Sequence, residues 1–166
     1  MAIKSKTKTK VTDTGKKKLL AEMSKMRKAP FVKIGVLGAA GKDAKTTTDG
    51  KNSPLSVIAV AVFNEFGTET IPERPFIRTT ARKKRKEVQQ FEKQLIGMVL
   101  RSKGSFGMKR VLNGIGLKFQ TLIQKGFREE AWKPNSPKTV SRKGSSQPLI
   151  DTGQLRQSIS YKVEKI

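Results

Sequence analysis

The stretch "FVKIGVLG", Phe31–Gly38, decides the fold prediction. Its aliphatic residues fall at every second position, which is the period of a β-strand, and a glycine ends the run. The stretch "SISYKVEKI", Ser158–Ile166, alternates in the same way through Ile159, Tyr161 and Val163. We therefore expect two strands far apart in the sequence that can pair with each other.

Three helices are predicted between these strands, over about Leu55–Phe66, Phe76–Arg101 and Phe106–Phe127, because apolar residues recur there at spacings of three and four. The inward residues are expected to be Leu55, Ile58, Ala59, Val62, Phe63 and Phe66; then Ile77, Ala81, Val88, Phe91, Leu95 and Met98; then Val111, Ile115, Phe119, Leu122 and Phe127. Two or three strands with about three helices predict a small α+β domain with an antiparallel or mixed sheet.

Breaks in these patterns predict the connections. Gly38–Ser53 is expected to be a polar loop, since its glycine spacing does not match a phosphate-binding loop. Ser53 is a plausible cap of the first core helix, and Gly67 is expected to end it. In the third helix, Gly114 and Gly116 either admit another backbone closely or mark a kink.

The N-terminal region predicts a basic tail. Met1–Lys18 holds seven Lys against one Asp, so it should be disordered when unbound. Leu19, Met23 and Met26 then predict a short amphipathic helix, used for docking, that ends before Pro30. Residues 1–28 thus form the tail and short helix, and residues 29–166 form one α+β domain with an extended arm at about 128–148.

Composition excludes most enzyme classes. The chain has 36 Lys and Arg against 13 Asp and Glu, a net charge of +23, which favours a polyanionic partner or an acidic protein surface. It contains no Cys and no His, which removes thiol nucleophiles, the usual general base and the commonest metal ligands. We expect no cofactor, no metal and no membrane span, and a soluble protein made in the cytoplasm.

Two short motifs could suggest acid chemistry. Asp13 and Asp151 each stand in Asp-Thr-Gly, as in aspartic proteases, but Asp13 lies in a sequence too polar to bury a catalytic loop. We expect instead that Asp151 or Thr152 caps a short helix whose buried face carries Leu155 and Ile159. Three carboxylates, Glu65, Glu69 and Glu73, are expected to pair with Arg74 or Arg78.

The segment Phe127–Gln147 is predicted to be a long polar arm with one conspicuous aromatic, Trp132. A large aromatic isolated in polar sequence fits an interface anchor better than a core residue. We therefore expect a neighbouring subunit or another partner to order the arm.

The order of these segments resembles the virion morphogenesis, or tail completion, proteins of tailed bacteriophages. Two blocks carry the resemblance, Asn64–Arg78 ("NEFGTETIPERPFIR") and Trp132–Ile159. It implies a structural, non-enzymatic protein at the head-tail junction of the virion, which forms a ring around the DNA channel and contacts other neck, connector or tail proteins. The interface candidates are Phe66, Arg74, Trp132, Asp151, Leu155 and Arg156.

The positive charge also supports an alternative, a basic protein that binds nucleic acid without sequence specificity. The candidate polyanion-binding residues are Lys4, Lys6, Lys8, Lys10, Lys16, Lys17 and Lys18 in the tail, and Arg82, Lys83, Lys84, Arg85 and Lys86 in "RKKRK". Stacking aromatics are scarce, so electrostatic contact with duplex DNA is expected, and base readout is not.

Overall fold

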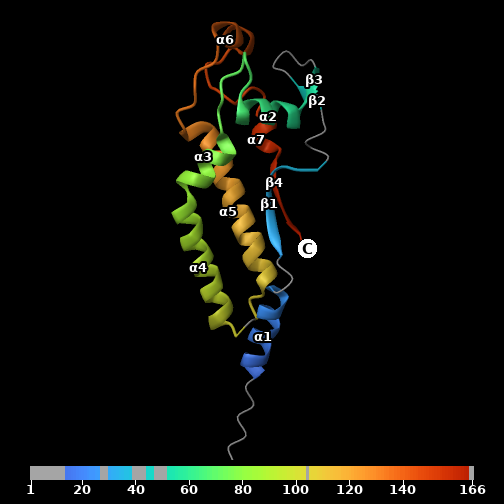
Figure 1. Cartoon of the computed structure of the whole chain (residues 1–166), viewed down its shortest axis with the longest axis vertical. Helices are drawn as coiled ribbons and strands as arrows, with labels where there is room; N and C mark the ends of the chain where they lie inside the picture. Colours follow the sequence, from blue (N-terminus) through green and yellow to red (C-terminus); the bar gives the residue numbers. More distant parts are fainter. Residues whose placement is uncertain (1–13, 27–29, 39–43, 47–51, 104, 165–166) are drawn as a thin grey trace, which may run out of the picture.

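The computed structural model describes residues 14–26, 30–38, 44–46, 52–103 and 105–164. Its elements are α1 (Thr14–Met26), β1 (Phe31–Val36), β2 (Ala44–Thr46), β3 (Asn52–Ser56), α2 (Val57–Phe66), α3 (Phe76–Lys83), α4 (Arg85–Arg101), α5 (Met108–Glu129), α6 (Pro137–Lys143), α7 (Gln154–Gln157) and β4 (Ile159–Glu164). The predicted α+β class is confirmed. The molecule is elongated, with α4 and α5 along its length, α2 and α6 at one end and α1 at the other (Figure 1).

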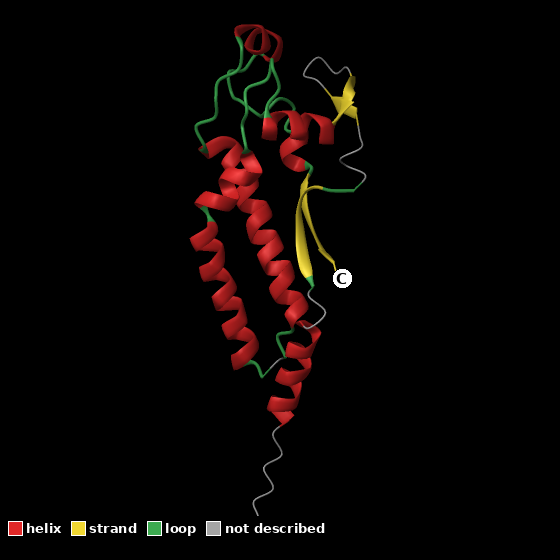
Figure 2. Ribbon diagram, viewed as in Figure 1, coloured by secondary structure: helices red, strands yellow, loops and turns green. Residues whose placement is uncertain are grey.

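The main sheet has the predicted pairing. β1 and β4 are antiparallel neighbours, with Phe31 opposite Glu164 and Val36 opposite Ile159. The pair lies beside α5 (Figure 2). A Cβ atom added to Gly116 of α5 would lie 2.3 Å from Cδ2 of Tyr161, so this glycine lets the ring rest directly on the helix. The predicted close approach therefore exists, but a side-chain ring makes it and not a backbone.

Two apolar clusters hold the fold together. The first joins α2, α3, α5, α7 and β4 through Val57, Ala61, Phe76, Ile123, Phe127, Leu155 and Ile159. Within it the rings of Phe76 and Phe127 have centroids 4.9 Å apart. The second cluster, Leu95, Val99, Met108 and Val111, lies between α4 and α5. The core therefore extends along α5, which contributes to both clusters.

The basic tail was predicted to extend to Lys18, but α1 already begins at Thr14, so residues 14–18 are helical. The predicted short helix is confirmed, and Leu19 packs against the second cluster, but Met23, expected on the same apolar side, is exposed. An Oε2 atom of Glu22 accepts a hydrogen bond of 2.7 Å from the backbone N–H of Met108, at the start of α5. A carboxylate is favourable there because of the helix dipole. Residues 1–13 lie outside the described residues.

The predicted long helix Phe76–Arg101 is wrong, because α3 and α4 are separate helices that meet at Lys84. One continuous apolar pattern cannot describe two helices with different axes. Accordingly Ala81 and Met98 are exposed, although both were expected to point inward, and Val99 is buried in their place.

The start of α2 also differs from the prediction. The Oγ atom of Ser56, and not that of Ser53, accepts the capping hydrogen bond, 3.2 Å from the N–H of Ala59. The expected loop Gly38–Ser53 overlaps an antiparallel hairpin, since β2 pairs with β3. Gly67 ends α2 as expected, with a φ of 78° and its N–H bonded to the carbonyl of Phe63.

Candidate functional site

Arg74 joins the two sequence blocks that carry the family resemblance. Its Nε atom donates to the carbonyl of Lys133 at 2.7 Å, and its Nη2 atom donates to the carbonyl of Pro134 at 2.8 Å and to Oδ1 of Asn135 at 3.2 Å. Its Nη1 atom donates to Oδ1 of Asn64 at 3.3 Å. The residue is only 4% exposed. Burial lowers the pKa of the guanidinium, which nevertheless stays charged at neutral pH.

The arm is consequently ordered by its own chain. Trp132 packs against the first core cluster, and its Nε1 atom donates to the carbonyl of Gly126 at 2.9 Å. Part of the predicted polar arm is helical, since Pro137–Lys143 form α6, and Ser136 caps this helix by accepting from the N–H of Thr139. The expectation that Trp132 stands apart from the core is therefore wrong, because contacts within the chain partly bury it, whereas the contact of the arm with a partner stays a prediction.

Glu65 fixes the start of α3. Its Oε2 atom accepts from the N–H of Ile77 at 2.9 Å, and its Oε1 atom accepts from the N–H of Arg78 at 3.0 Å and from Nε of Arg78 at 3.1 Å. Pro75 precedes α3 and makes no side-chain cap, so a carboxylate from α2 takes that role. Arg78 also pairs with Glu73 at 2.8 Å. The hydrogen bond that Arg78 donates to the Glu65 carboxylate is the main cause that raises the pKa of Arg78.

These contacts decide between the two predicted arginine partners. The acidic residues Glu65 and Glu73 pair with Arg78, as expected, whereas Arg74 binds carbonyl and amide oxygens. Both oxygens of Glu65 accept hydrogen bonds from neighbouring groups, so the arrangement is structural and offers no acid or base to a substrate.

The two blocks enclose a groove of about 470 Å³. Its lining is mixed, with apolar residues such as Leu55 and Leu149 beside the cations Arg142 and Lys143 and the carboxylate of Asp151. This places Asp151 in the wall of a wide surface groove.

The short helix after Asp151 differs in part from its prediction. Gly153 occupies the cap position of α7, and Oγ1 of Thr152 accepts from the N–H of Gln154 at 3.4 Å. Thr152, one of the two predicted capping side chains, therefore forms a hydrogen bond to the helix start. Leu155 is buried in the first cluster, as expected, and is not available as an interface residue. Arg156 is half-buried.

The most prominent surface feature is an apolar row that begins just before α2 and continues along it. Leu55, Ile58, Val62 and Phe66, named here the α2 stripe, are exposed, and the exposed fraction reaches 62% at Phe66. All four were expected in the core, which is wrong. The side of α2 that faces the core instead carries Val57, Ala61 and Glu65. Contiguous exposed apolar side chains are typical of surfaces that bind other molecules.

The "RKKRK" run lies at the junction of α3 and α4. Lys83 pairs with Glu130, and Nζ of Lys84 lies 3.9 Å from an Oε2 atom of Glu87. Arg82, Arg85 and Lys86 are exposed. In the tail, Lys16, Lys17 and Lys18 are exposed on α1, whereas Lys4, Lys6, Lys8 and Lys10 lie outside the described residues. The structure thus keeps the two basic segments on different elements.

Within the described ranges, no group of three or more His, Cys, Asp or Glu side chains could hold a metal ion. In the same part of the chain, no helix is long and apolar enough to cross a membrane. Comparison with protein-family models, with curated proteins and with solved structures finds no match for the chain. The surfaces are therefore interpreted from their own chemistry.

Sequence reasoning predicted the pairing of Glu65 with an arginine but missed its capping of α3, and it missed Asn64 as a support of this region. The signal that could have found Glu65 is Pro75, because a proline at the start of a helix cannot supply a side-chain cap. Asn135 was missed for a different reason: its contact with Arg74 spans 61 residues of sequence, which no local pattern reports.

Proposed function

We propose that this chain is a structural, non-enzymatic protein of a tailed-bacteriophage virion, which forms a ring at the head-tail junction. The observation that carries the proposal is the α2 stripe, whose four large apolar side chains remain exposed in a chain with only modest apolar content. Burial of apolar surface contributes about 25 cal/mol per Å², so a subunit interface is the state in which such a row is stable.

Two further observations support it. Arg74 ties the two blocks of the family resemblance into one structural unit, at the end of the molecule that carries α2. Asp151 lines the groove together with the cations Arg142 and Lys143, a mixed lining that supports binding of another molecule. A binding surface is therefore the better account of this end of the molecule.

The proposal is tested on particles. Heads and tails made without this protein are mixed with the purified chain, and joined particles are counted by electron microscopy. We expect the chain to restore joining, and a gold-labelled copy to lie at the head-tail junction. In parallel, sedimentation should show a discrete oligomer, alone or on isolated heads. Failure to restore joining and to bind either particle would refute the proposal.

A second candidate function, nonspecific DNA binding, is favoured by the exposed cations Arg82, Arg85 and Lys86. Each cation that no longer touches a phosphate should flatten the log–log salt dependence of DNA affinity by about 0.9. Replacing all three with alanine should therefore reduce the slope by about 2 to 3, without any change in sequence preference. An unchanged slope would assign these residues to another role.

A further inference from the structure

A second exposed apolar row lies on α4. Ile96 and Leu100, named here the α4 pair, are four residues apart, and Leu100 is 54% exposed. They belong to the second half of α4, whose end lies toward α1, whereas α2 lies at the opposite end of the molecule (Figure 1). The chain thus exposes apolar helix surface in two separate places.

The two rows have matching geometry. Ile58, Val62 and Phe66 recur at intervals of four residues, as do Ile96 and Leu100. Side chains four apart form the ridges that interdigitate in the commonest class of helix packing, with helices crossing at about −50°. The α2 stripe and the α4 pair are therefore suitable for packing against each other as helix surfaces.

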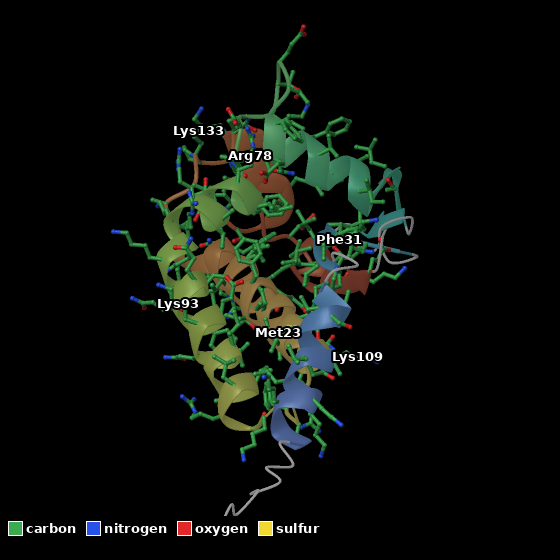
Figure 3. All side chains as sticks on the ribbon, turned by 60° about the horizontal axis from the view of Figure 1, so that its bottom comes forward. Met23, Phe31, Arg78, Lys93, Lys109 and Lys133 are labelled. Atoms are coloured by element: carbon green, nitrogen blue, oxygen red, sulfur yellow. The ribbon has the colours of Figure 1, made fainter. Side chains whose placement is uncertain are left out.

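The charges around the two rows differ in sign on balance. Glu69 and Glu73 follow the last residue of the α2 stripe and are exposed, although Glu73 is paired with Arg78, whose guanidinium lies 4.7 Å from the centroid of the Phe66 ring. Lys93 and Arg101 flank the α4 pair in sequence and are exposed, as is Glu92, one turn before Ile96, so two cations stand there against one carboxylate. Figure 3 shows Lys93 on the outer side of α4, pointing away from α5. Contact between the rows would bring a carboxylate of one surface toward cations of the other.

We propose that the α2 stripe of one copy packs against the α4 pair of a second copy, in a head-to-tail contact. This inference rests on the proposed function, for which it identifies the subunit interface. Because the two surfaces differ, each copy keeps one of them available after the first contact, so association continues until the assembly closes as a ring. In a symmetric contact of two α2 stripes, Glu69 would meet the same surface of the second copy, where Arg78 is already engaged by Glu65 and Glu73.

The absence of cysteine from the chain makes the contact directly testable. Chains carrying Val62→Cys and chains carrying Leu100→Cys are prepared separately, mixed, and oxidised. We expect a disulfide between the two kinds of chain, and little between chains of one kind. A dominant Val62→Cys homodimer would overturn the proposal in favour of a symmetric contact. No disulfide of either kind would also overturn it.

Two substitutions test the energetics. Val62→Asp should weaken self-association at least about thirtyfold, the effect of a strong interface residue. Leu117→Asp is the matched control, because Leu117 is 57% exposed on α5 outside both rows. It should leave association unchanged. Equal melting temperatures of the two variants would show that Val62→Asp acts on assembly and not on folding. Association that survives Val62→Asp would overturn the inference.

Charge reversal supplies an independent test of the contact. Glu69→Lys should weaken association, and Lys93→Glu in the same chain should restore part of the loss, because both surfaces are present on every copy.

The failure of this inference differs from the failure of the proposed function. Rings that form without the Val62–Leu100 disulfide would refute the interface alone. Cross-linked open filaments that never join heads to tails would refute the ring and leave the interface standing.

Discussion

Replacing Arg74 with alanine should detach the arm from the domain. The guanidinium donates two hydrogen bonds to the carbonyls of Lys133 and Pro134, and one each to Asn135 and Asn64. Hydrogen bonds to a charged group contribute about 1.5–3 kcal/mol each, but they are not additive, and the released carbonyls would regain water. We therefore expect the free energy of unfolding to fall by about 2–4 kcal/mol, because several neutral acceptors lose their donor at once.

The assay uses the only tryptophan of the chain, Trp132, which directly precedes the arm residues that Arg74 holds. Urea unfolding followed by its emission gives the loss of stability. The emission of the native state reports the arm separately, and it should shift to the red because Trp132 becomes more exposed. Arg74→Lys should be intermediate, since an ammonium cannot reproduce the planar fork of donors. Arg142→Ala, which removes an exposed cation of the same region, is the control.

Two results would refute this reasoning. A loss below about 1 kcal/mol would mean that the hydrogen bonds of Arg74 are replaced by water at little cost. A full loss of stability with unchanged native emission would mean that Arg74 supports the domain but does not hold the arm.

The other predictions concern separate parts of the fold. Glu65→Ala leaves the first N–H groups of α3 without their acceptor and should cost about 2–4 kcal/mol of unfolding free energy in thermal denaturation, with Glu65→Gln losing less; equal losses would indicate a packing role. Gly116→Ala should cost about 1–3 kcal/mol through overpacking against Tyr161, and the cost should disappear when Tyr161 is shortened to alanine. The hydrogen bond from Lys118 holds the pKa of the Glu87 carboxyl below its ordinary value of 4.5. The ionised Glu87 carboxylate therefore stabilises the fold fully above pH 4.5, and this stabilisation is lost as the pH falls through the lower folded pKa. The melting temperature should accordingly decline less steeply with acid in Glu87→Gln than in the original chain. Parallel declines would contradict the assignment.

The sequence predicted the positions of helices and strands better than it predicted which side of each helix is buried. The strand pair and α5 were predictable because their apolar residues alternate with polar ones, so the pattern itself identifies the inner side. In α2 the run "VIAVAVF", Val57–Phe63, is apolar on every side. Periodicity then carries no information about orientation, and the true inner face depends on Glu65, whose partners come from α3.

The sequence predicted the region that holds the candidate site, but not the contacts that its residues make. The two blocks of the family resemblance pointed to the region that Arg74 assembles, but the sequence assigned Arg74 and Trp132 to a partner and not to the chain itself. The reason is physical: their hydrogen bonds go to backbone carbonyls, and a carbonyl acceptor is present at every position and leaves no trace in the sequence.

The pairing of β1 with β4 has a consequence for how the molecule is made. Residues of β1 meet their partners only after nearly all of the described chain has been synthesised, because Phe31 lies opposite Glu164. Contacts between α4 and α5 are much more local and can form early, whereas closing so long a loop is entropically costly and slow. Synthesis that stops before Ile159 would yield helices without the second strand, which pulse-labelled hydrogen exchange can detect. β4 therefore acts as a check on the synthesis of this core: a chain that stops before Ile159 lacks part of the first core cluster, to which Ile159 belongs.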